Sequence, residues 1–289
     1  MNADRPKLKQ DRGGERLVYW RVPALQGLQL LRGHRSHAHL PRHSHTTFQI
    51  AFIESGCQQL RIKGNTHRVG RGQIVVLHPG EAHTEGPNDN SGWCARAFYP
   101  SLEMILNAVA STGTKCGGTP FFQDPVLNDG ELIETLRSLH QLLEAPGGDD
   151  LQRDTLAALA AARLVARHAR PGTINEAPDP GRIALERVRC CLEERCTENL
   201  SLRELAAIAN LNPFHLLRSF TRAYGLPPYA YLMQSRVARA RALLDRGVAI
   251  IEASQEVGFF DQSHFSRNFK RLLGVTPGAY ARDARSYKI

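Results

Sequence analysis

The stretch GFFDQSHFSRNFKRLLGVTPGAYAR at residues 258–282 decides the fold of the C-terminal part of this chain. Asp261 stands directly before an amphipathic run that stops at Gly274, and an Asp before and a Gly after a run are typical helix end signals. The shorter run AIIEASQEVG at 249–258 also has helical spacing. Two short helices joined by a tight turn at the two phenylalanines predict a helix-turn-helix unit.

An upstream segment repeats this layout at a distance of about 50 residues. The segment SLRELAAIANLNPFHLLRSFTRAYG at 201–225 opens with a capping box, in which Ser201 and Glu204 satisfy each other's terminal amide groups. The Asn-Pro pair at 212–213 supplies an N-cap and a proline at the first helical position. A longer helical run at 228–247 joins the two units. The sequence therefore predicts an internal duplication of the helix-turn-helix.

The doubled unit resembles the DNA-binding module of AraC-type transcription regulators, a bacterial family. The resemblance extends over about 100 residues, from Ile183 to Arg282, and includes the tail that follows the second unit. It implies that 182–289 is an all-α domain that binds promoter DNA and places one helix of each unit in the major groove. RNA polymerase is a further expected partner if the protein is an activator.

The resemblance implies these base-facing positions: Pro213, Phe214, Leu217 and Arg218 in the first unit, and Gln262, Ser263, Ser266 and Arg267 in the second. An arginine fork matches a guanine edge and a glutamine matches adenine. Phe214 and Leu217 offer apolar contacts only, so we expect the first helix to read sequence less sharply. Arg222, Lys270 and Arg271 are better placed for phosphates, which supply affinity without sequence information.

The charge of the chain supports a polyanionic partner. Residues 1–181 carry 20 basic and 18 acidic side chains, a net charge of +2, whereas 182–289 carry 17 and 10, a net charge of +7. Fifteen of those 17 basic residues are arginines. A solvated, arginine-rich helical surface would give the same composition.

Several protein classes are not favoured by the sequence. We find no run of about 18 apolar residues that would span a membrane and no apolar segment of a secretory signal near the N-terminus. Six scattered cysteines without a CxxC pair favour reduced thiols over a disulfide framework. We therefore expect a cytoplasmic, nucleoid-associated protein.

The N-terminal part has the texture of a β-barrel followed by helices. Short apolar runs separated by Gly and polar turns predict strands at 48–53, 58–63 and 73–78. Helical spacing follows at 102–110, 131–145 and 151–169. The last of these runs is rich in Ala and Leu and could dock on the barrel or on a second subunit, which leaves a homodimer open.

These patterns define an α+β chain of two domains. We expect a mobile arm at 1–16, a sensing domain at 17–170 whose barrel ends near residue 100, a linker at 171–181 and the DNA-binding domain at 182–289. The linker is predicted from its three prolines and two glycines, which no helix or central strand tolerates.

Four polar residues in the barrel region form a candidate site. His43 and His45 alternate, as they would on one face of a strand, and Gln49 falls on the same face. The segment GQIVVLHPGEAH at 72–83 adds His83. This spacing resembles the cupin pattern, with Gln49 where the cupin glutamate is expected, and AraC-type regulators often carry a cupin-like sensor.

The chemistry of this site remains open at the level of sequence. His43, His45, Gln49 and His83, with Arg42 beside them, could hydrogen-bond a small effector. The three imidazoles and Gln49 could instead hold a divalent metal, although the missing carboxylate weakens that reading. The groups could also merely satisfy one another.

Three functions are compatible with these features. The first is a sequence-specific regulator of the AraC type, without catalytic activity, controlled by an effector in the cupin barrel. The second is a metal-dependent cupin enzyme fused to a DNA-binding module, although no other catalytic motif accompanies the histidines. The third is an effector-independent DNA binder with an inert barrel.

Overall fold

The structure is a computed structural model that describes residues 16–36, 39–89, 91–110, 119–144, 150–171 and 180–286. The arm expected at 1–16 therefore lies outside the described residues except for Arg16, and so does most of the linker expected at 171–181. Helix α4 (Pro180–Glu194) begins within that predicted linker. The first turn of a helix tolerates proline, because its amide would have no intrahelical partner there.

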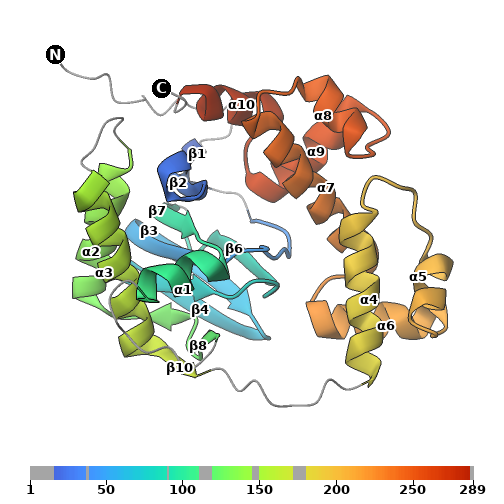
Figure 1. Cartoon of the computed structure of the whole chain (residues 1–289), viewed down its shortest axis with the longest axis horizontal. Helices are drawn as coiled ribbons and strands as arrows, with labels where there is room; N and C mark the ends of the chain where they lie inside the picture. The colour runs from blue at the N-terminus through green and yellow to red at the C-terminus, as the bar shows by residue number, and fades with distance from the viewer. Residues whose placement is uncertain are drawn as a thin grey trace.

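The N-terminal strands form an antiparallel barrel of the cupin type (Figure 1). One sheet has the strand order β1-β2-β7-β3-β5-β9. These strands are β1 (Arg16–Val22), β2 (Leu28–Arg35), β7 (Trp93–Tyr99), β3 (Gln49–Ile62), β5 (Ile74–Leu77) and β9 (Val126–Leu127). A 3-10 turn at Pro23–Leu25 joins β1 to β2. The remaining strands, β4 (Asn65–Gly70) and β6 (His83–Pro87), pair with the second half of β3.

Strand β3 is continuous where the sequence predicted two strands. Its first half pairs with β5 and β7, and its second half, from Cys57 onward, pairs with β4 and β6. A register shift between Ile53 and Ser55 bends the strand, and Gly56 follows with a φ of +76°. A Cβ on Gly56 would lie 2.1 Å from the carbonyl oxygen of Gly92. The glycine thus lets β3 turn from one sheet into the other, whereas it was expected to end the run.

Three helices cover the outer face of the larger sheet. They are α1 (Leu102–Ala110), α2 (Gly130–Leu142) and α3 (Asp150–His168). A small sheet of β8 (Pro120–Phe122) and β10 (Ala169–Pro171) closes this layer. Helix α3 buries Ala160, Leu164 and Val165 against its neighbours and leaves Leu151 75% exposed. Figure 1 shows α2 and α3 on the side of the barrel away from the C-terminal domain.

The C-terminal domain consists, in the residues described, of seven helices. They are α4, α5 (Leu202–Ile208), α6 (Pro213–Tyr224), α7 (Pro228–Asp245), α8 (Ile250–Glu256), α9 (Gln262–Leu273) and α10 (Pro277–Ser286). The predicted helix ends are confirmed. Ser201 and Glu204 form the capping box, and Asp261 accepts a hydrogen bond from the amide of His264 at 2.6 Å. Gly274 ends α9 in the left-handed conformation.

The two helix-turn-helix units, α5–α6 and α8–α9, are fixed to each other by Arg236 of α7. Its buried guanidinium donates to the carbonyl oxygens of Cys196 and Glu198 beside the first unit, at 2.6 and 2.8 Å. It also donates to that of Gly258 in the second unit, at 2.6 Å. A Cβ on Gly258 would lie 2.3 Å from the carbonyl oxygen of Thr197, so the turn of the second unit needs a glycine here.

The two domains share one hydrophobic cluster, which joins β1 to α9 and α10. Tyr19 donates to the carbonyl oxygen of Leu273 at 2.9 Å, and its ring centroid lies 5.8 Å from that of Tyr280. Asp245, at the end of α7, bonds both Arg21 of the barrel and the hydroxyl of Tyr280. The second helix-turn-helix unit is therefore docked on the edge of the barrel.

In the part of the chain that the structure describes, no helix has both the length and the apolar character of a membrane span.

Candidate functional site

The three predicted histidines of the barrel lie together. The ring centroid of His43 lies 5.0 Å from that of His45 and 4.3 Å from that of His83. One nitrogen from each ring lies within 4.8 Å of the others. His43 and His45 were expected on a strand, but they precede β3 in an irregular segment, and His43 forms an isolated β-bridge to His83. We call His43, His45 and His83 the histidine cluster.

Backbone carbonyls orient two of these rings. The Nδ1 of His43 lies 2.9 Å from the carbonyl oxygen of Pro41, and the Nδ1 of His83 lies 2.9 Å from that of Glu81. A carbonyl oxygen only accepts hydrogen bonds, so both Nδ1 atoms must carry the proton. In the neutral rings, each Nε2 then presents a lone pair. The Nε2 atoms of His45 and His83 are buried and find no hydrogen-bond partner in the described part of the chain.

Glu85 supplies the carboxylate that the sequence pattern lacked. It lies two residues beyond His83 on β6, and its Oε1 is 3.9 Å from the Nε2 of His83. Gln49, at the position of the expected glutamate, donates from its Nε2 to the same oxygen at 2.9 Å. Sequence analysis missed Glu85, although the alternation H-T-E along a strand would place it on the same face as His83.

Burial and neighbouring charges both act on the ionisable groups of the cluster. Burial, with the charge of His83 as the next cause, lowers the pKa of His43 to about 3. Burial and the charge of His43 also hold the pKa of His45 well below its ordinary value. Burial alone would raise the pKa of Glu85, but the charges of His83, His43 and Arg35 together bring it below its ordinary value.

The side of the cluster that carries His45 faces the DNA-binding domain. The ring of Tyr99 lies edge-on to that of His45, with 5.3 Å between centroids. Burial raises the pKa of the Tyr99 hydroxyl well above its ordinary value. Arg241 of α7 contributes a positive charge that lowers the pKa of His45, and its guanidinium lies 5.9 Å from the ring centroid of Tyr19. Gln234, also on α7, donates to the carbonyl oxygen of Ser44 at 3.3 Å.

Arg42, which the sequence analysis set beside the cluster, lies apart from it, and so does Trp93. The side chain of Arg42 is exposed, and its guanidinium lies beside Gly225 at the end of α6, where a Cβ would be 3.1 Å from Nη2. Trp93 is buried in the hydrophobic core. Arg42 therefore lies at the contact between the domains, while Gln49 is brought to the cluster.

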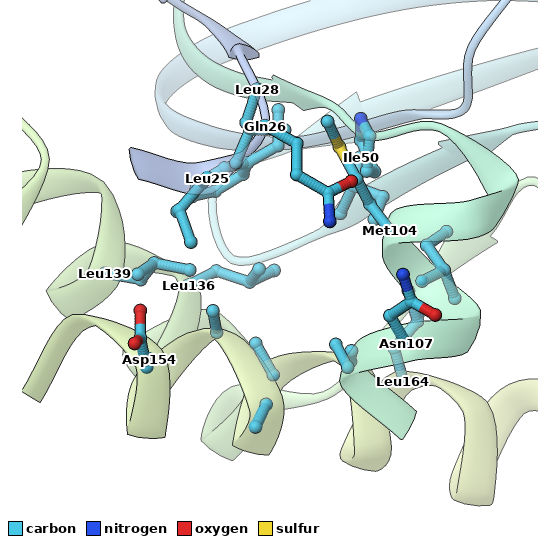
Figure 2. Close-up of a pocket in the computed structure, with 18 of the residues that line it drawn as sticks. Leu25, Gln26, Leu28, Ile50, Met104, Asn107, Leu136, Leu139, Asp154 and Leu164 are labelled. Carbon is cyan, nitrogen blue, oxygen red and sulfur yellow. The ribbon is translucent and has the colours of Figure 1, made fainter. Parts of the chain in front are cut away.

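A separate apolar cavity of about 260 Å³ lies between the larger sheet and its covering helices. Figure 2 shows Leu25, Leu28 and Ile50 of the sheet side opposite Leu136, Leu139 and Leu164 of α2 and α3. The polar side chains that Figure 2 labels along the lining are Gln26, Asn107 and Asp154. This chemistry suits an apolar molecule with a small polar group.

The predicted contacts of the first helix-turn-helix unit lie on α6. Phe214, at its first turn, is 80% exposed. Arg218 and Arg222 are exposed, whereas Pro213 and Leu217 are half-buried. An aromatic ring this exposed at the start of a helix is unusual for a packing residue and suits a contact with another molecule.

The predicted contacts of the second unit are more polar and lie on α9. Gln262, Ser263, Arg267, Lys270 and Arg271 are exposed, and Ser266 is half-buried. Arg271 donates to the side chain of Asn268 at 2.9 Å, which holds its guanidinium near the helix. His215 is exposed rather than packed, while the half-buried His264 lies edge-on to the ring of Phe259 at 5.3 Å.

Taken together, a cupin-like barrel and a doubled helix-turn-helix define a ligand-binding domain fused to a DNA-binding domain. Residues 28–161 match the model of the AraC-like ligand binding domain, and residues 205–283 match that of a helix-turn-helix domain. The chain is 30% identical over 224 residues to the uncharacterized HTH-type transcriptional regulator YbfI of Bacillus subtilis, covering 78% of this chain and 80% of that protein. It belongs to the AraC-type transcription regulators.

The chain is similar to a further regulator in sequence and to two solved structures in fold. The chain is 26% identical over 261 residues to the MmsAB operon regulatory protein of Pseudomonas aeruginosa, covering 88% of this chain and 80% of that one. ToxT from Vibrio cholerae has the same fold, with a TM-score of 0.57 at 13% identity over 93% of this chain and 98% of that one. A further ToxT structure is described as bound to an unsaturated fatty acid, with a TM-score of 0.56 at 14% identity, covering 94% of this chain and 96% of that one.

Proposed function

We propose that this protein is a cytoplasmic regulator that binds a two-part promoter site through α6 and α9. A ligand bound in the barrel controls this binding. The observation that carries the proposal is the position of α7. This helix joins the two DNA-binding units, bonds both of them through Arg236, and also faces the histidine cluster. A ligand that binds one placement of α7 more tightly than the other shifts the protein toward that placement and so changes the affinity for DNA. The size of this change is limited by the difference between the ligand's affinities for the two placements.

The two recognition helices contribute differently to this proposal. On α9, Arg267 and Gln262 present the side chains that read guanine and adenine edges, while Lys270 and Arg271 fit phosphates. On α6, Phe214 and Leu217 present apolar groups that suit thymine methyl groups. We therefore expect one well-defined and one degenerate half-site about one helical turn apart, roughly 34 Å.

Binding-site selection from random duplex DNA tests the proposal. The wild-type protein should select DNA that contains both half-sites. Arg267→Ala should weaken the base preference at one position, with a loss of about 1–3 kcal/mol of discrimination at that base pair. Arg61→Ala is the control, because it removes an equal charge from an exposed position on the barrel. Recovery of motif-free binding whose affinity falls steeply with salt would contradict specific reading.

The ligand site that we propose is formed by His43, His45, Gln49 and His83. These side chains turn polar groups toward one another at the end of the barrel that faces α7. The apolar cavity in Figure 2 is a second candidate site, favoured by its volume and lining. Thermal shifts measured with His83→Ala and with the cavity-filling Ala157→Leu distinguish the two sites. A shift abolished only by Ala157→Leu would contradict the first.

A homodimer and RNA polymerase are further proposed partners. The exposed Leu151 and Leu159 on α3 lie on the side of the barrel away from the DNA-binding domain, so a second copy could pack there without covering α6 or α9. Sedimentation velocity of the full chain and of a Leu151→Glu variant tests the dimer. A contact with polymerase would accompany activation and is tested by transcription from the selected promoter.

A further inference from the structure

The histidine cluster has the features of a metal site rather than of a site for an organic molecule. His43 and His83 are 4% and 1% exposed, and their ring centroids are 4.3 Å apart. Three rings this close together, each with a nitrogen near those of the others, are arranged like the ligands of a single ion. Two nitrogens bound to one zinc ion lie at most about 4.2 Å apart. Since the cluster's nitrogens lie within 4.8 Å, small ring rotations would close them on an ion.

The protonation of the rings is already suited to a metal. The carbonyl oxygens of Pro41 and Glu81 hold the protons on Nδ1 of His43 and His83. Metal-binding histidines are commonly oriented in this way by a second hydrogen bond, which turns the other nitrogen toward the ion. The buried, unpartnered Nε2 atoms of His45 and His83 otherwise have an energetic cost, because each loses a hydrogen bond to water on folding.

Glu85 completes the donor set and balances the charge. Its carboxylate oxygen lies 3.9 Å from the Nε2 of His83, and Gln49 holds that oxygen through a hydrogen bond of 2.9 Å. Gln49 thus acts as a positioning residue for the carboxylate. Three imidazoles and one carboxylate suit zinc and the other divalent transition metals.

We propose that His43, His45, His83 and Glu85 bind one divalent transition-metal ion at the end of the barrel that α7 covers. A divalent ion is thus the class of ligand that we infer for the site of the proposed function. Regulation by this ion rests on the proposed function, whereas the binding of the ion does not rest on it. Because Ser44, between two of the ligands, bonds Gln234 of α7 at 3.3 Å, an ion that draws His43 and His45 together also acts on this contact.

The test is a direct binding measurement on the full chain. Protein stripped with a chelator is titrated with Co²⁺, whose visible absorption reports imidazole coordination, and then with Zn²⁺ in competition with a chelator of known affinity. We expect one ion per chain. His83→Ala and Glu85→Gln should each weaken metal binding by at least about 10- to 100-fold. This loss of affinity is found even when the changed residue only orients a metal ligand. Glu85→Gln keeps an acceptor for Gln49, so it separates lost charge from lost packing.

His67→Ala is the matched control, because His67 lies on the same barrel outside the cluster. It should leave the affinity for both ions unchanged, and circular dichroism confirms that each variant is folded. Absence of stoichiometric binding, or binding that the cluster variants do not weaken, overturns the proposal. The proposal is also overturned if an organic anion, and no metal ion, binds at the cluster. That outcome would still be compatible with a ligand-controlled regulator. Metal binding without any change in affinity for the selected DNA supports the site but contradicts the proposed control.

Discussion

Glu144 illustrates how single residues hold the covering helices on the barrel. It follows α2 and bonds Arg96 of β7 and Arg32 of β2, the latter at 2.7 Å. His140 of α2 accepts from Arg96 and lies 3.1 Å from the carbonyl oxygen of Leu31, to which its Nε2 must donate. Burial alone would raise the pKa of Glu144, but the neighbouring His140 and the charges of Arg96 and Arg32 lower it to about 2. This network links the sheet to α2 through charges that need an ionised carboxylate.

The first prediction concerns the stability of the protein in acid. A carboxyl group whose pKa is lower in the folded than in the unfolded state stabilises the protein above its unfolded value of 4.5. That stability, at most about 3 kcal/mol, is lost as the pH falls from about 4.5 to about 2. Glu144→Gln should lower the free energy of unfolding at pH 7 and flatten its dependence in that range, measured by urea unfolding.

Glu134→Gln is the control for this prediction. It makes the same change on α2, where the Glu134 side chain is 69% exposed and pairs with Arg137 in the adjacent turn. Its effect should stay within about 0.5 kcal/mol at every pH. An equal acid dependence for the Glu144 and Glu134 variants would show that other groups govern the acid transition. His140 is one such group, because its burial lowers its pKa and costs stability as the pH falls below 6.5.

The candidate site could be predicted from single residues only where the pattern was local. His43, His45, Gln49 and His83 come together as their spacing predicted. Arg42 does not join them, because its side chain points to the end of α6, a contact that spans the two domains. Glu85 was missed because the alternation along 83–85 points to the cluster only once this segment is known to be a strand paired with β3.

At the scale of elements, the C-terminal helices were the most predictable part. Their ends depend on side chains next to them in sequence, such as Asp261 before α9 and Gly274 after it. Strand β3 was not predictable in the same way. Gly56 is a turn signal by sequence, but in the barrel it allows a bend that only the close approach of Gly92 explains. Long-range pairing decides which of the two meanings a glycine has.

The second prediction concerns the cap of α9. The carboxylate of Asp261 accepts from the amide of His264 and holds the turn that carries Gln262 and Ser263. Asp261→Ala should cost about 1 kcal/mol of stability. It should also weaken specific DNA binding, because the first turn of α9 frays. Thermal unfolding and titration of the selected DNA measure the two effects.

Asp261→Asn separates the cap from the charge. Asparagine caps a helix as well as aspartate does, so its stability should stay near that of the wild type. Its affinity for DNA should not fall, since a negative charge near the phosphates has been removed. If Asp261→Asn weakens specific binding as much as Asp261→Ala does, then the carboxylate has a role other than capping.

At the scale of the whole molecule, the barrel and the DNA-binding domain act on each other through β1 and α7. Tyr19 bonds the end of α9, and Asp245 receives bonds from both Arg21 and Tyr280. The two contacts between the domains could not be predicted from the sequence, because Tyr19 and Leu273 lie 254 residues apart, Arg21 and Asp245 lie 224 apart, and no local pattern pairs them. The docked arrangement restrains the second recognition helix relative to the barrel.

The third prediction is that this interface transmits the effect of the ligand. If Zn²⁺ changes the affinity for the selected DNA by some factor, then that DNA must change the affinity for Zn²⁺ by the same factor. Asp245→Ala removes the carboxylate that both Arg21 and Tyr280 bond. It should bring both factors closer to a value of 1, and by the same amount. Titrations of DNA with and without Zn²⁺, and of Zn²⁺ with and without DNA, measure them.

Glu198→Ala is the control, because its exposed pair with Arg195 lies wholly within the DNA-binding domain. It should leave both factors as they are in the wild type. If Asp245→Ala keeps the wild-type factors while it weakens the docking, measured as a separation of the thermal transitions of the two domains, then the interface does not carry the coupling. We would then expect the signal to pass through Ser44 and Gln234, a direct contact between the cluster region and α7, and Gln234→Ala would be the variant that abolishes it.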